Sequence, residues 1–525
     1  MKLALAQINP TVGALMANTA KIIALIEEAR QAQVDLIVFP ELAITGYPPE
    51  DLLLKPQFID DNLACLKKIV AKCSGLAVYL GFVDQDKGKL FNAGAFVDQG
   101  KIKGVYHKVN LPNYSVFDEK RYFSPGTKPL TVTVKGKKIG LGICEDIWVE
   151  SGPYAKGLDL ILNINASPFH FGKIRERQTL LSKRAKELKT TIVYVNMVGG
   201  QDELVFDGGS MVIDQSGRLQ AACDQYREEL LIFDLDQDWQ DKHAWAGPEA
   251  EIYYALVLGV KDYLQKNAFP DAVIGLSGGI DSALTLAIAV DALGQKKVHA
   301  VFMPSAYSSL QSRTDALKLA TDLGVDWLEI PINKVMDQYL GELAPAFKHK
   351  PANIAEENLQ ARIRGNYLMA LSNKHGWLVL TTGNKSEMST GYCTMYGDMA
   401  GGFAVLKDVP KTLVYKLARW RNQHGGVIPQ PIIDRPPSAE LKPNQLDQDT
   451  LPPYDQLDAV MKAYVEENRS PQEIIAAGFP ISTVNNVIKM IDQTEYKRRQ
   501  SPPGPRITPR AFGKDWRLPI TNGYK

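Results

Sequence analysis

The chain has 525 residues, of which 45% are hydrophobic and 23% are charged, and its formal net charge is +1. This length and composition are typical of a soluble globular chain with two or more domains. The charge predicts no nucleic-acid or membrane partner, and the short apolar stretch before Pro10 is neither a signal peptide nor a membrane span. Five cysteines without a CxxC pair indicate neither a disulfide framework nor a zinc site, so we expect a cytoplasmic protein.

Short β-rich runs alternate with helix-like runs over the first half of the chain. The predicted helices are 17–33 and 174–189, and the predicted strands are 3–8, 36–42, 77–83, 94–98, 138–146, 158–166 and 191–199, followed by a strand–turn–strand unit over 208–219. This pattern predicts an α/β sandwich or layered sheet. A polar stretch without periodicity follows, so we predict a domain over 1–238, a linker over 239–250 and a second domain over 251–525.

The second half repeats the alternation at a spacing typical of a doubly wound parallel sheet, whose ligands bind at the carboxyl ends of the strands. Its predicted strands are 272–277, 298–304, 327–332 and 377–383. Its predicted helices are 253–267, 312–324 and 356–376, and a further helix follows the strand 272–277. The Pro-rich region 428–453 and the tail from Ser501 are predicted loops or lids. The Gly-rich composition of 395–412 predicts a mobile lid over phosphates.

The stretch VIGLSGGIDSALTLAIA, residues 273–289, predicts a phosphate-binding turn. A buried strand ends at Ser277-Gly278-Gly279 and a helix follows, so backbone N–H groups point at one spot and favour an anion. Asp281 would repel phosphate unless a cation lies between them, which makes it a candidate Mg²⁺ ligand. The Gly-Lys-Ser/Thr motif of γ-phosphoryl transfer is missing here.

Polar residues also follow the strand at 377–383 and should meet the phosphate-binding turn at the same sheet edge. Thr382 can hydrogen-bond a nucleotide and Glu387 can hold a second Mg²⁺. Lys407 and Lys411 can neutralise phosphate oxygens, although two loop lysines are equally often a solvated surface.

SGGIDS resembles the loop of the N-type ATP pyrophosphatases, and TGNKSE, YGD, the lysine-containing loop and RPPSAEL are similar to NAD synthetases over about residues 250–500. The resemblance implies a Rossmann-like domain that adenylates a substrate with ATP and Mg²⁺. It implies contacts to deamido-NAD by Asn358, Glu387 and Lys497, and a weaker role for Asp398. The implied ATP-binding residues are Gly275, Leu276, Ser277, Gly278, Gly279, Ile280, Asp281, Ser282, Thr382, Lys411 and Ser438, and the implied metal ligands are Asp281 and Glu387.

Three short motifs in the first half carry the residues of a thiol amidase. Glu41 ends a strand in FPELAITGY, Lys108 lies in YHKVNLPNY, and Cys144 follows a strand in GLGICEDIW. Amide cleavage needs a thiolate, a base that also protonates ammonia, and positive charge at the oxyanion. Taken singly, a cysteine after a strand is usually a buried apolar residue, and the two charged residues are ordinary surface or ion-pair groups.

Together, in this order, the three residues resemble the nitrilase superfamily of carbon–nitrogen hydrolases, which implies an αββα fold. LPNYSVFDEKRYFSPG is similar to the glutaminase domain of glutamine-dependent NAD synthetases. That resemblance implies glutamine binding by Tyr114, Ser167 and Lys173, and Glu119 is an additional candidate carboxylate.

These features predict a ligase that amidates deamido-NAD with ammonia from glutamine, using ATP and Mg²⁺ as a cytoplasmic homo-oligomer. An alternative is another amidotransferase of the ATP pyrophosphatase superfamily, making GMP or asparagine. A nucleotide-sensing or scaffolding protein with inactive sites is a second alternative, against which the intact Glu41, Lys108 and Cys144 argue.

Overall fold

The computed structural model describes residues 1–150, 152–237, 243–348 and 350–524. It divides into two compact units, Met1–Gly247 and Pro248–Lys525. The first helix of the second unit, α4, begins at Pro248. Of the predicted linker, 243–247 therefore belong to the first unit, while 239–242 lie outside the described residues.

The first unit contains two six-stranded mixed sheets and a small hairpin of β10 and β11. One sheet has the order β14-β1-β2-β3-β4-β5, and the other has the order β13-β12-β9-β8-β7-β6. The strands of the first sheet are β1 (Lys2–Gln7), β2 (Leu36–Val38), β3 (Ala77–Asp86), β4 (Lys89–Asp98), β5 (Lys101–His107) and β14 (Glu229–Asp234). The remaining strands are β6 (Thr131–Val134), β7 (Lys137–Ile143), β8 (Leu160–Asn165), β9 (Thr191–Asn196), β10 (Val198–Gln201), β11 (Leu204–Asp207), β12 (Met211–Ile213) and β13 (Leu219–Ala222).

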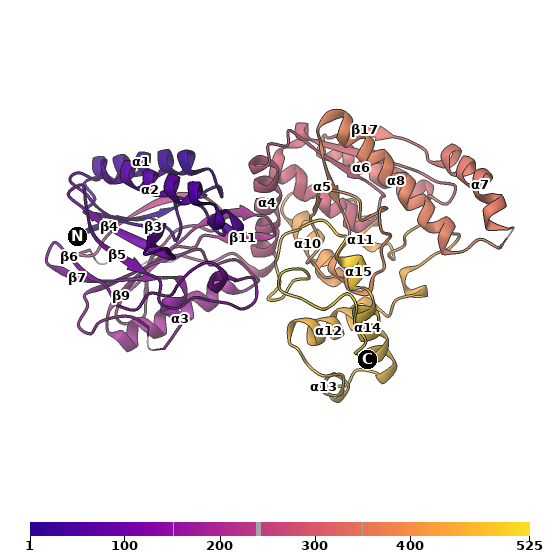
Figure 1. Cartoon of the computed structure of the whole chain (residues 1–525). Helices are drawn as coiled ribbons and strands as arrows, with labels where there is room; N and C mark the ends of the chain where they lie inside the picture. Colours follow the sequence, from indigo (N-terminus) through magenta and orange to yellow (C-terminus); the bar gives the residue numbers. More distant parts are fainter. Residues whose placement is uncertain (151, 238–242, 349, 525) are drawn as a thin grey trace. The chain divides into compact units, whose positions relative to one another are not determined.

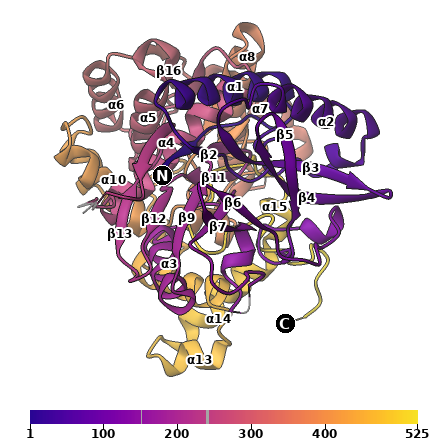
Figure 2. The ribbon, with the colours of Figure 1, turned by 90° about the vertical axis from the view of Figure 1, so that its left-hand side faces the viewer.

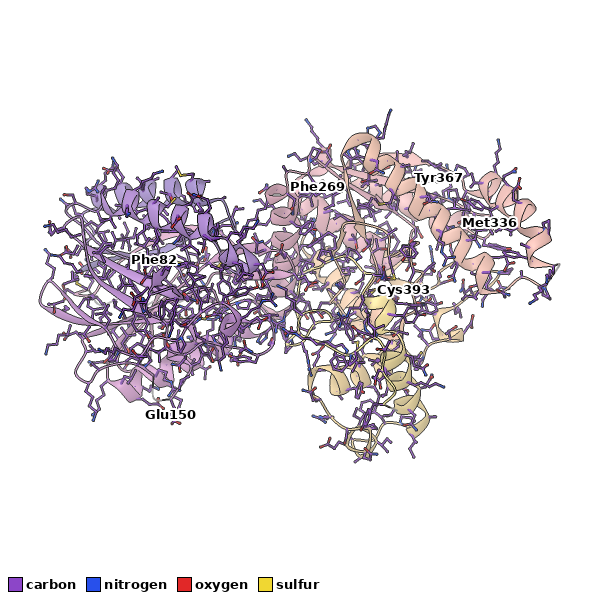
Figure 3. The ribbon with its side chains drawn as sticks, in the orientation of Figure 1. Phe82, Glu150, Phe269, Met336, Tyr367 and Cys393 are labelled. Atoms are coloured by element: carbon purple, nitrogen blue, oxygen red, sulfur yellow. The ribbon has the colours of Figure 1, made fainter. Side chains whose placement is uncertain are left out.

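Strand alternation produces the layers of this unit. Leu3 and Leu5 of β1 pack with residues of the other sheet, such as Leu141 and Leu162, so this core lies between the sheets. Ala4 and Ala6 face the opposite way, toward α1 (Leu15–Gln31) and α2 (Pro56–Val70), and α3 (Lys173–Leu188) covers the other sheet. Figures 1 and 2 show α1 and α2 along one side of this unit and α3 along the other, and Phe82 of β3 lies between them (Figure 3). The αββα prediction is confirmed.

The second unit is built on a five-stranded sheet with the order β17-β16-β15-β18-β19, in which all neighbouring strands are parallel. Chain order therefore reverses at β15, as in doubly wound folds, and the predicted parallel sheet is confirmed. The strands are β15 (Ala272–Gly275), β16 (Val298–Phe302), β17 (Asp326–Glu329), β18 (Leu378–Thr381) and β19 (Phe403–Ala404).

Helices surround this sheet and form a separate C-terminal cluster (Figure 1). The helices before, between and after the strands are α4 (Pro248–Lys266), α5 (Ile280–Leu293), α6 (Leu310–Leu323), α7 (Asn333–Phe347), α8 (Ile354–His375), α9 (Lys385–Thr390), α10 (Lys411–Gln423) and α11 (Gln430–Asp434). The C-terminal cluster contains α12 (Tyr454–Met461), α13 (Pro471–Ala476), α14 (Ile481–Gln493) and α15 (Glu495–Arg498), and Phe512 and Trp516 of the tail complete its core.

Two segments predicted as lids or loops are packed against this unit. Residues 403–409, part of the predicted lid over 395–412, are buried. Ala404 donates from its backbone N–H to the carbonyl of Pro503 at 2.8 Å, and Lys407 Nζ donates to the carbonyl of Pro502 at 2.9 Å. The mobile-lid prediction is wrong for residues 403–409, because their backbone and side chains are already held by the tail.

Lys385, at the start of α9, anchors that packing. Its fully buried Nζ contacts Asp408 Oδ1 at 3.0 Å and Glu466 Oε1 at 2.7 Å, and donates to Thr508 Oγ1 at 2.7 Å. Asp408 Oδ2 in turn accepts the backbone N–H of Thr508 at 2.7 Å. One lysine therefore joins α9, the segment before α10, the helical turn Lys462–Glu466 after α12 and the tail.

Lys385→Met should destabilise the second unit by about 3–5 kcal/mol, because two buried carboxylates lose their cation. Denaturant unfolding of the full chain measures this change. Lys416→Met is the matched control, since Lys416 is exposed on α10. An equal free energy of unfolding for both variants would contradict this role of Lys385.

Candidate active sites

The first candidate site is a buried cluster of two carboxylates around one lysine. Lys108 Nζ lies 2.7 Å from Glu41 Oε1 and 2.7 Å from Glu119 Oε1, and none of the three side chains is exposed by more than 5%. Burial lowers the pKa of Lys108, but the Glu119 and Glu41 carboxylates raise it more, so its net pKa lies well above the usual value. Lys108 is therefore a permanent positive charge in this site.

Cys144 lies at the carboxyl end of β7, where a single turn of 3-10 helix, Cys144–Ile147, begins. Its φ is +45°, a left-handed conformation that is costly for a side chain larger than glycine and common at active sites. Burial raises the pKa of the Cys144 thiol well above its usual value; the Glu41 charge raises it further and the Lys108 charge opposes this. The thiol is consequently neutral in the free protein, and the charges of Glu41 and Lys108 both influence its pKa.

Backbone packing positions Glu41. A Cβ on Gly81 of β3 would lie 2.2 Å from the backbone nitrogen of Leu42, so only glycine allows this close approach. Glu41 Oε2 accepts the backbone N–H of Ala166 at 2.8 Å, and Oε1 accepts Asn92 Nδ2 at 2.7 Å. Both carboxylate oxygens are therefore held.

Asp146 links the cysteine turn to the lysine strand. It accepts the backbone N–H of Ile143 at 3.0 Å, the Tyr106 hydroxyl at 2.7 Å and the backbone N–H of Asn110 at 2.9 Å. Asp146 and Asn92 were missed by the sequence analysis. The available signal was their polarity within otherwise apolar strands and turns, at positions where a buried polar group needs a partner.

The predicted glutamine-binding residues lie around this cluster. Tyr114 donates its hydroxyl to Glu145, the neighbour of Cys144, at 3.0 Å, and its side chain is exposed. Lys173 Nζ lies 4.0 Å from the centre of the Trp148 ring, and burial lowers its pKa.

Ser167 is held more firmly than the other two glutamine-binding candidates. Its Oγ accepts Arg177 Nε at 3.2 Å and its carbonyl accepts Arg177 Nη2 at 2.8 Å, while Arg177 forms a fully buried ion pair with Asp207 at 2.7 Å. This support also lay beyond the sequence analysis, because Arg177 is fixed by Asp207 of β11, which is far from Ser167 in the sequence.

The second candidate site is a cavity of about 410 Å³ in the second unit. It follows the carboxyl ends of β15 and β18, where the chain order of the sheet reverses. Every predicted ATP- and deamido-NAD-binding residue lines it: Gly275, Leu276, Ser277, Gly278, Gly279, Ile280, Asp281, Ser282, Asn358, Thr382, Glu387, Lys411, Ser438 and Lys497. Cys393, which also lines the cavity, is labelled in Figure 3.

Two carboxylates converge on one lysine in this cavity. Lys411 Nζ contacts Asp281 Oδ2 at 2.5 Å and lies 3.6 Å from Glu387 Oε1. Burial raises the pKa of Glu387 to about 8, against the opposing charge of Lys411. Burial lowers the pKa of Lys411, but Asp281 and Glu387 raise it to a net value above the usual range. Both carboxylates therefore face the ammonium group of Lys411.

The backbone shapes the phosphate-binding turn beside these groups. Gly278 has a φ of +84°, and a Cβ there would lie 2.4 Å from the carbonyl oxygen of Ser312. Gly279 precedes α5, whose free N–H groups begin there. No side chain at Gly278 or Gly279 therefore separates the backbone of this turn from a ligand.

The remaining predicted residues divide between the cavity and its support. Asn358 Oδ1 accepts the Thr394 hydroxyl at 2.8 Å, and Lys497 Nζ donates to the Cys393 carbonyl at 2.9 Å. Asp398 lines the cavity, and burial raises its pKa to about 6. Lys407 is not among the lining residues, because its side chain is directed to the tail.

Comparisons with known proteins agree with this pairing of sites. Residues 2–244 match the carbon-nitrogen hydrolase family and residues 252–501 match the NAD synthase family. The chain therefore combines an amide-hydrolysing class of domain with a nucleotide-amidating one.

Full-length relatives define the family more narrowly. Glutamine-dependent NAD(+) synthetases of Thermotoga maritima and Acinetobacter baylyi are 48% and 47% identical to this chain, and each alignment covers 100% of it and 99% of the relative. The solved glutamine-dependent NAD+ synthetase of Acinetobacter baumannii in complex with ADP is 45% identical, with a TM-score of 0.80 over 100% of this chain and 99% of that one. The chain belongs to the family of glutamine-dependent NAD(+) synthetases.

Within the described residues, no helix is both long and apolar enough to cross a membrane.

Glu119 provides a test of the buried cluster. Burial raises its pKa from an ordinary 4.5 to about 7, so the folded state binds this proton more tightly than the unfolded chain does. The free energy of unfolding should therefore fall as the pH rises from about 4.5 to about 7, by up to about 3 kcal/mol from this group. Glu119→Gln should lose that contribution, which denaturant titrations across this pH range would measure.

Glu150→Gln is the control for this measurement, because Glu150 is an exposed carboxylate of the same unit (Figure 3). It should keep the pH dependence of the unsubstituted chain. Parallel pH profiles for Glu119→Gln and the unsubstituted chain would contradict the proposed state of Glu119.

Proposed function

We propose that this chain converts deamido-NAD⁺, ATP, glutamine and water into NAD⁺, AMP, pyrophosphate and glutamate. The observation that carries the proposal is that one cavity unites the SGGIDS turn with Asp281, Glu387 and Lys411, in a chain that also holds a buried Glu–Lys–Cys cluster. Identity to glutamine-dependent NAD(+) synthetases extends over both halves, so GMP or asparagine synthesis is not favoured.

The first unit is proposed to release ammonia from glutamine. Glu41 takes the thiol proton as the Cys144 sulfur attacks the carboxamide carbon, and the Lys108 charge stabilises the oxyanion. Glu41 then returns the proton to the departing ammonia, and water cleaves the thioester. Glu119 positions Lys108 together with Glu41, since Nζ contacts both carboxylates at 2.7 Å. Tyr114, Ser167 and Lys173 are the proposed glutamine contacts.

The second unit is proposed to activate the nicotinate carboxylate with ATP. The carboxylate attacks the α-phosphorus, pyrophosphate leaves, and ammonia attacks the resulting adenylate carbonyl. The Gly275–Ser282 turn and Lys411 bind phosphate oxygens, Thr382 and Ser438 contact ATP, and Asn358, Glu387 and Lys497 contact deamido-NAD. Ammonia needs shelter from water between the two steps, because in neutral water it is mostly protonated and cannot attack.

Asp281 and Glu387 are the proposed Mg²⁺ ligands. Both residues line the cavity beside the phosphate-binding turn and both face Lys411, and Mg²⁺ usually takes one or two carboxylates together with substrate phosphates. When bound, Mg²⁺ supplies charge neutralisation to the leaving pyrophosphate. Lys411 would exchange its carboxylate contacts for phosphate contacts. A cytoplasmic location and a homo-oligomeric state remain predictions from the sequence.

Cys144→Ala should lower glutamine-driven NAD⁺ formation by about 10³-fold or more, because the nucleophile is lost. Synthesis from an added ammonium salt should continue, since only the nitrogen source is removed. Chromatographic measurement of NAD⁺ and AMP with each donor tests this, with Cys223→Ala as the buried-cysteine control from the same unit. Loss of both activities in a folded Cys144→Ala protein would refute the two-site assignment.

Asp281→Ala should instead lower NAD⁺ formation with either donor by about 10²–10³-fold, because an electrostatic contact to the reacting phosphates is lost. Steady-state rates over a Mg²⁺ titration measure this effect. Asp291→Ala is the control, since Asp291 lies on the same helix but pairs with Arg421 at 2.8 Å. Unchanged turnover and Mg²⁺ dependence in Asp281→Ala would be evidence against the assigned metal site.

A further inference from the structure

Helix α8 presents one stripe of residues to the cavity of the second unit. Glu357, Asn358, Ala361, Arg364 and Leu368 all line the cavity, at the three- and four-residue spacing of one helix face. Arg364 is the only cation on this stripe. None of the ligand contacts proposed above involves it.

Arg364 is half-buried and makes few contacts. Its Nε donates to the carbonyl of Met303 at 3.0 Å, and in the described part of the chain its two terminal nitrogens have no hydrogen-bond or ion-pair partner. Burial lowers the pKa of the guanidinium to about 10, and the Glu440 charge opposes this only in part. Glu440 is itself engaged, since it accepts the Ser312 hydroxyl at 2.7 Å and the Ser309 hydroxyl at 3.0 Å.

Two neighbouring arginines show the contrast. Arg435 also lines the cavity, but it pairs with Asp315 and donates to Ser312 Oγ at 2.7 Å. Arg362 of α8 donates to the carbonyl of Met395 at 3.3 Å and does not line the cavity. Arg364 alone among the three combines cavity exposure with strong desolvation and no carboxylate partner.

A desolvated cation without a counterion costs free energy, so an anion that enters the cavity would be strongly attracted to it. A guanidinium with two free nitrogens suits two oxygens of one phosphate or carboxylate group, which it binds as a fork. Both proposed nucleotide substrates carry such groups.

We propose that Arg364 binds an oxyanion of a nucleotide substrate through its two terminal nitrogens, either the phosphate chain of ATP or an oxyanion of deamido-NAD. This inference rests on the proposed function, because it takes the substrates from there. Arg364 is in this view a substrate-binding residue, and the Met303 carbonyl holds its Nε so that the terminal nitrogens point into the cavity.

The test is calorimetric titration of the full chain with ATP plus Mg²⁺ and, separately, with deamido-NAD. Arg364→Met should weaken the binding of one or both substrates by about 10–100-fold, the usual effect of losing a charge-assisted hydrogen bond. The substrate that loses affinity identifies the oxyanion. Arg364→Lys keeps the charge without the fork and should show a smaller loss.

Thermal unfolding of the ligand-free variants separates binding from folding. Removal of a half-buried charge without an ion-pair partner in the described residues should leave the Tm of Arg364→Met equal to or above that of the unsubstituted chain. Arg362→Met, the matched control, should keep both affinities. Three results would overturn the proposal. The first is unchanged substrate affinity in Arg364→Met, and the second is an equal loss of affinity in Arg362→Met. The third is weaker binding together with a lower Tm in both Arg364 variants.

Failure of the proposed function would look different. The unsubstituted chain would then bind no deamido-NAD and release no AMP and pyrophosphate. The ATP titration would still report whether Arg364 contacts a nucleotide oxyanion.

Discussion

A buried lysine between two carboxylates is the interaction on which both candidate sites depend. Lys108 is held by Glu41 and Glu119, and Lys411 faces Asp281 and Glu387. In each case the free-energy cost of burying an isolated charge is high, so the lysine and its two carboxylates have to lie together. The folds differ, but each unit brings its carboxylates and its lysine from different elements to one point, and the substrate then finds charges that are already oriented.

The sequence predicted the elements of both units well where periodicity was strong, such as the β15–α5 turn and the alternating strands of the first unit. Glu41, Cys144, the phosphate-binding turn and Thr382 could be proposed from the sequence, because each comes at the end of a predicted strand. Resemblance to known families implied the roles of Lys108, Asn358, Lys411, Ser438 and Lys497, which follow no predicted strand. Helices α7, α10, α12 and α14 and the short strands β5, β6 and β14 were not predicted. They have mixed composition, and their burial depends on neighbours that are distant in the chain.

Residues that act through other residues were harder to predict. The roles of Asn92 and Asp146 depend on the tertiary fold, which places β4 next to Glu41 and the Cys144 turn next to Asn110. The segment 403–409 has the glycine-flanked, lysine-containing composition of a mobile loop, yet the tail covers it and Lys385 supplies the buried charge that holds both. No local signal distinguishes a flexible loop from one that a segment a hundred residues later will bury.

The environment of Cys144 also has a consequence for oxidative chemistry. Peroxides and alkylating agents react with the thiolate, and the burial of Cys144 raises its pKa and keeps the thiol neutral. The proposed nucleophile is therefore held as the less reactive thiol while the site is empty, and in the proposed mechanism Glu41 takes its proton only during attack. A thiol enzyme of this design can remain reduced through an oxidative episode that would inactivate an exposed, low-pKa cysteine.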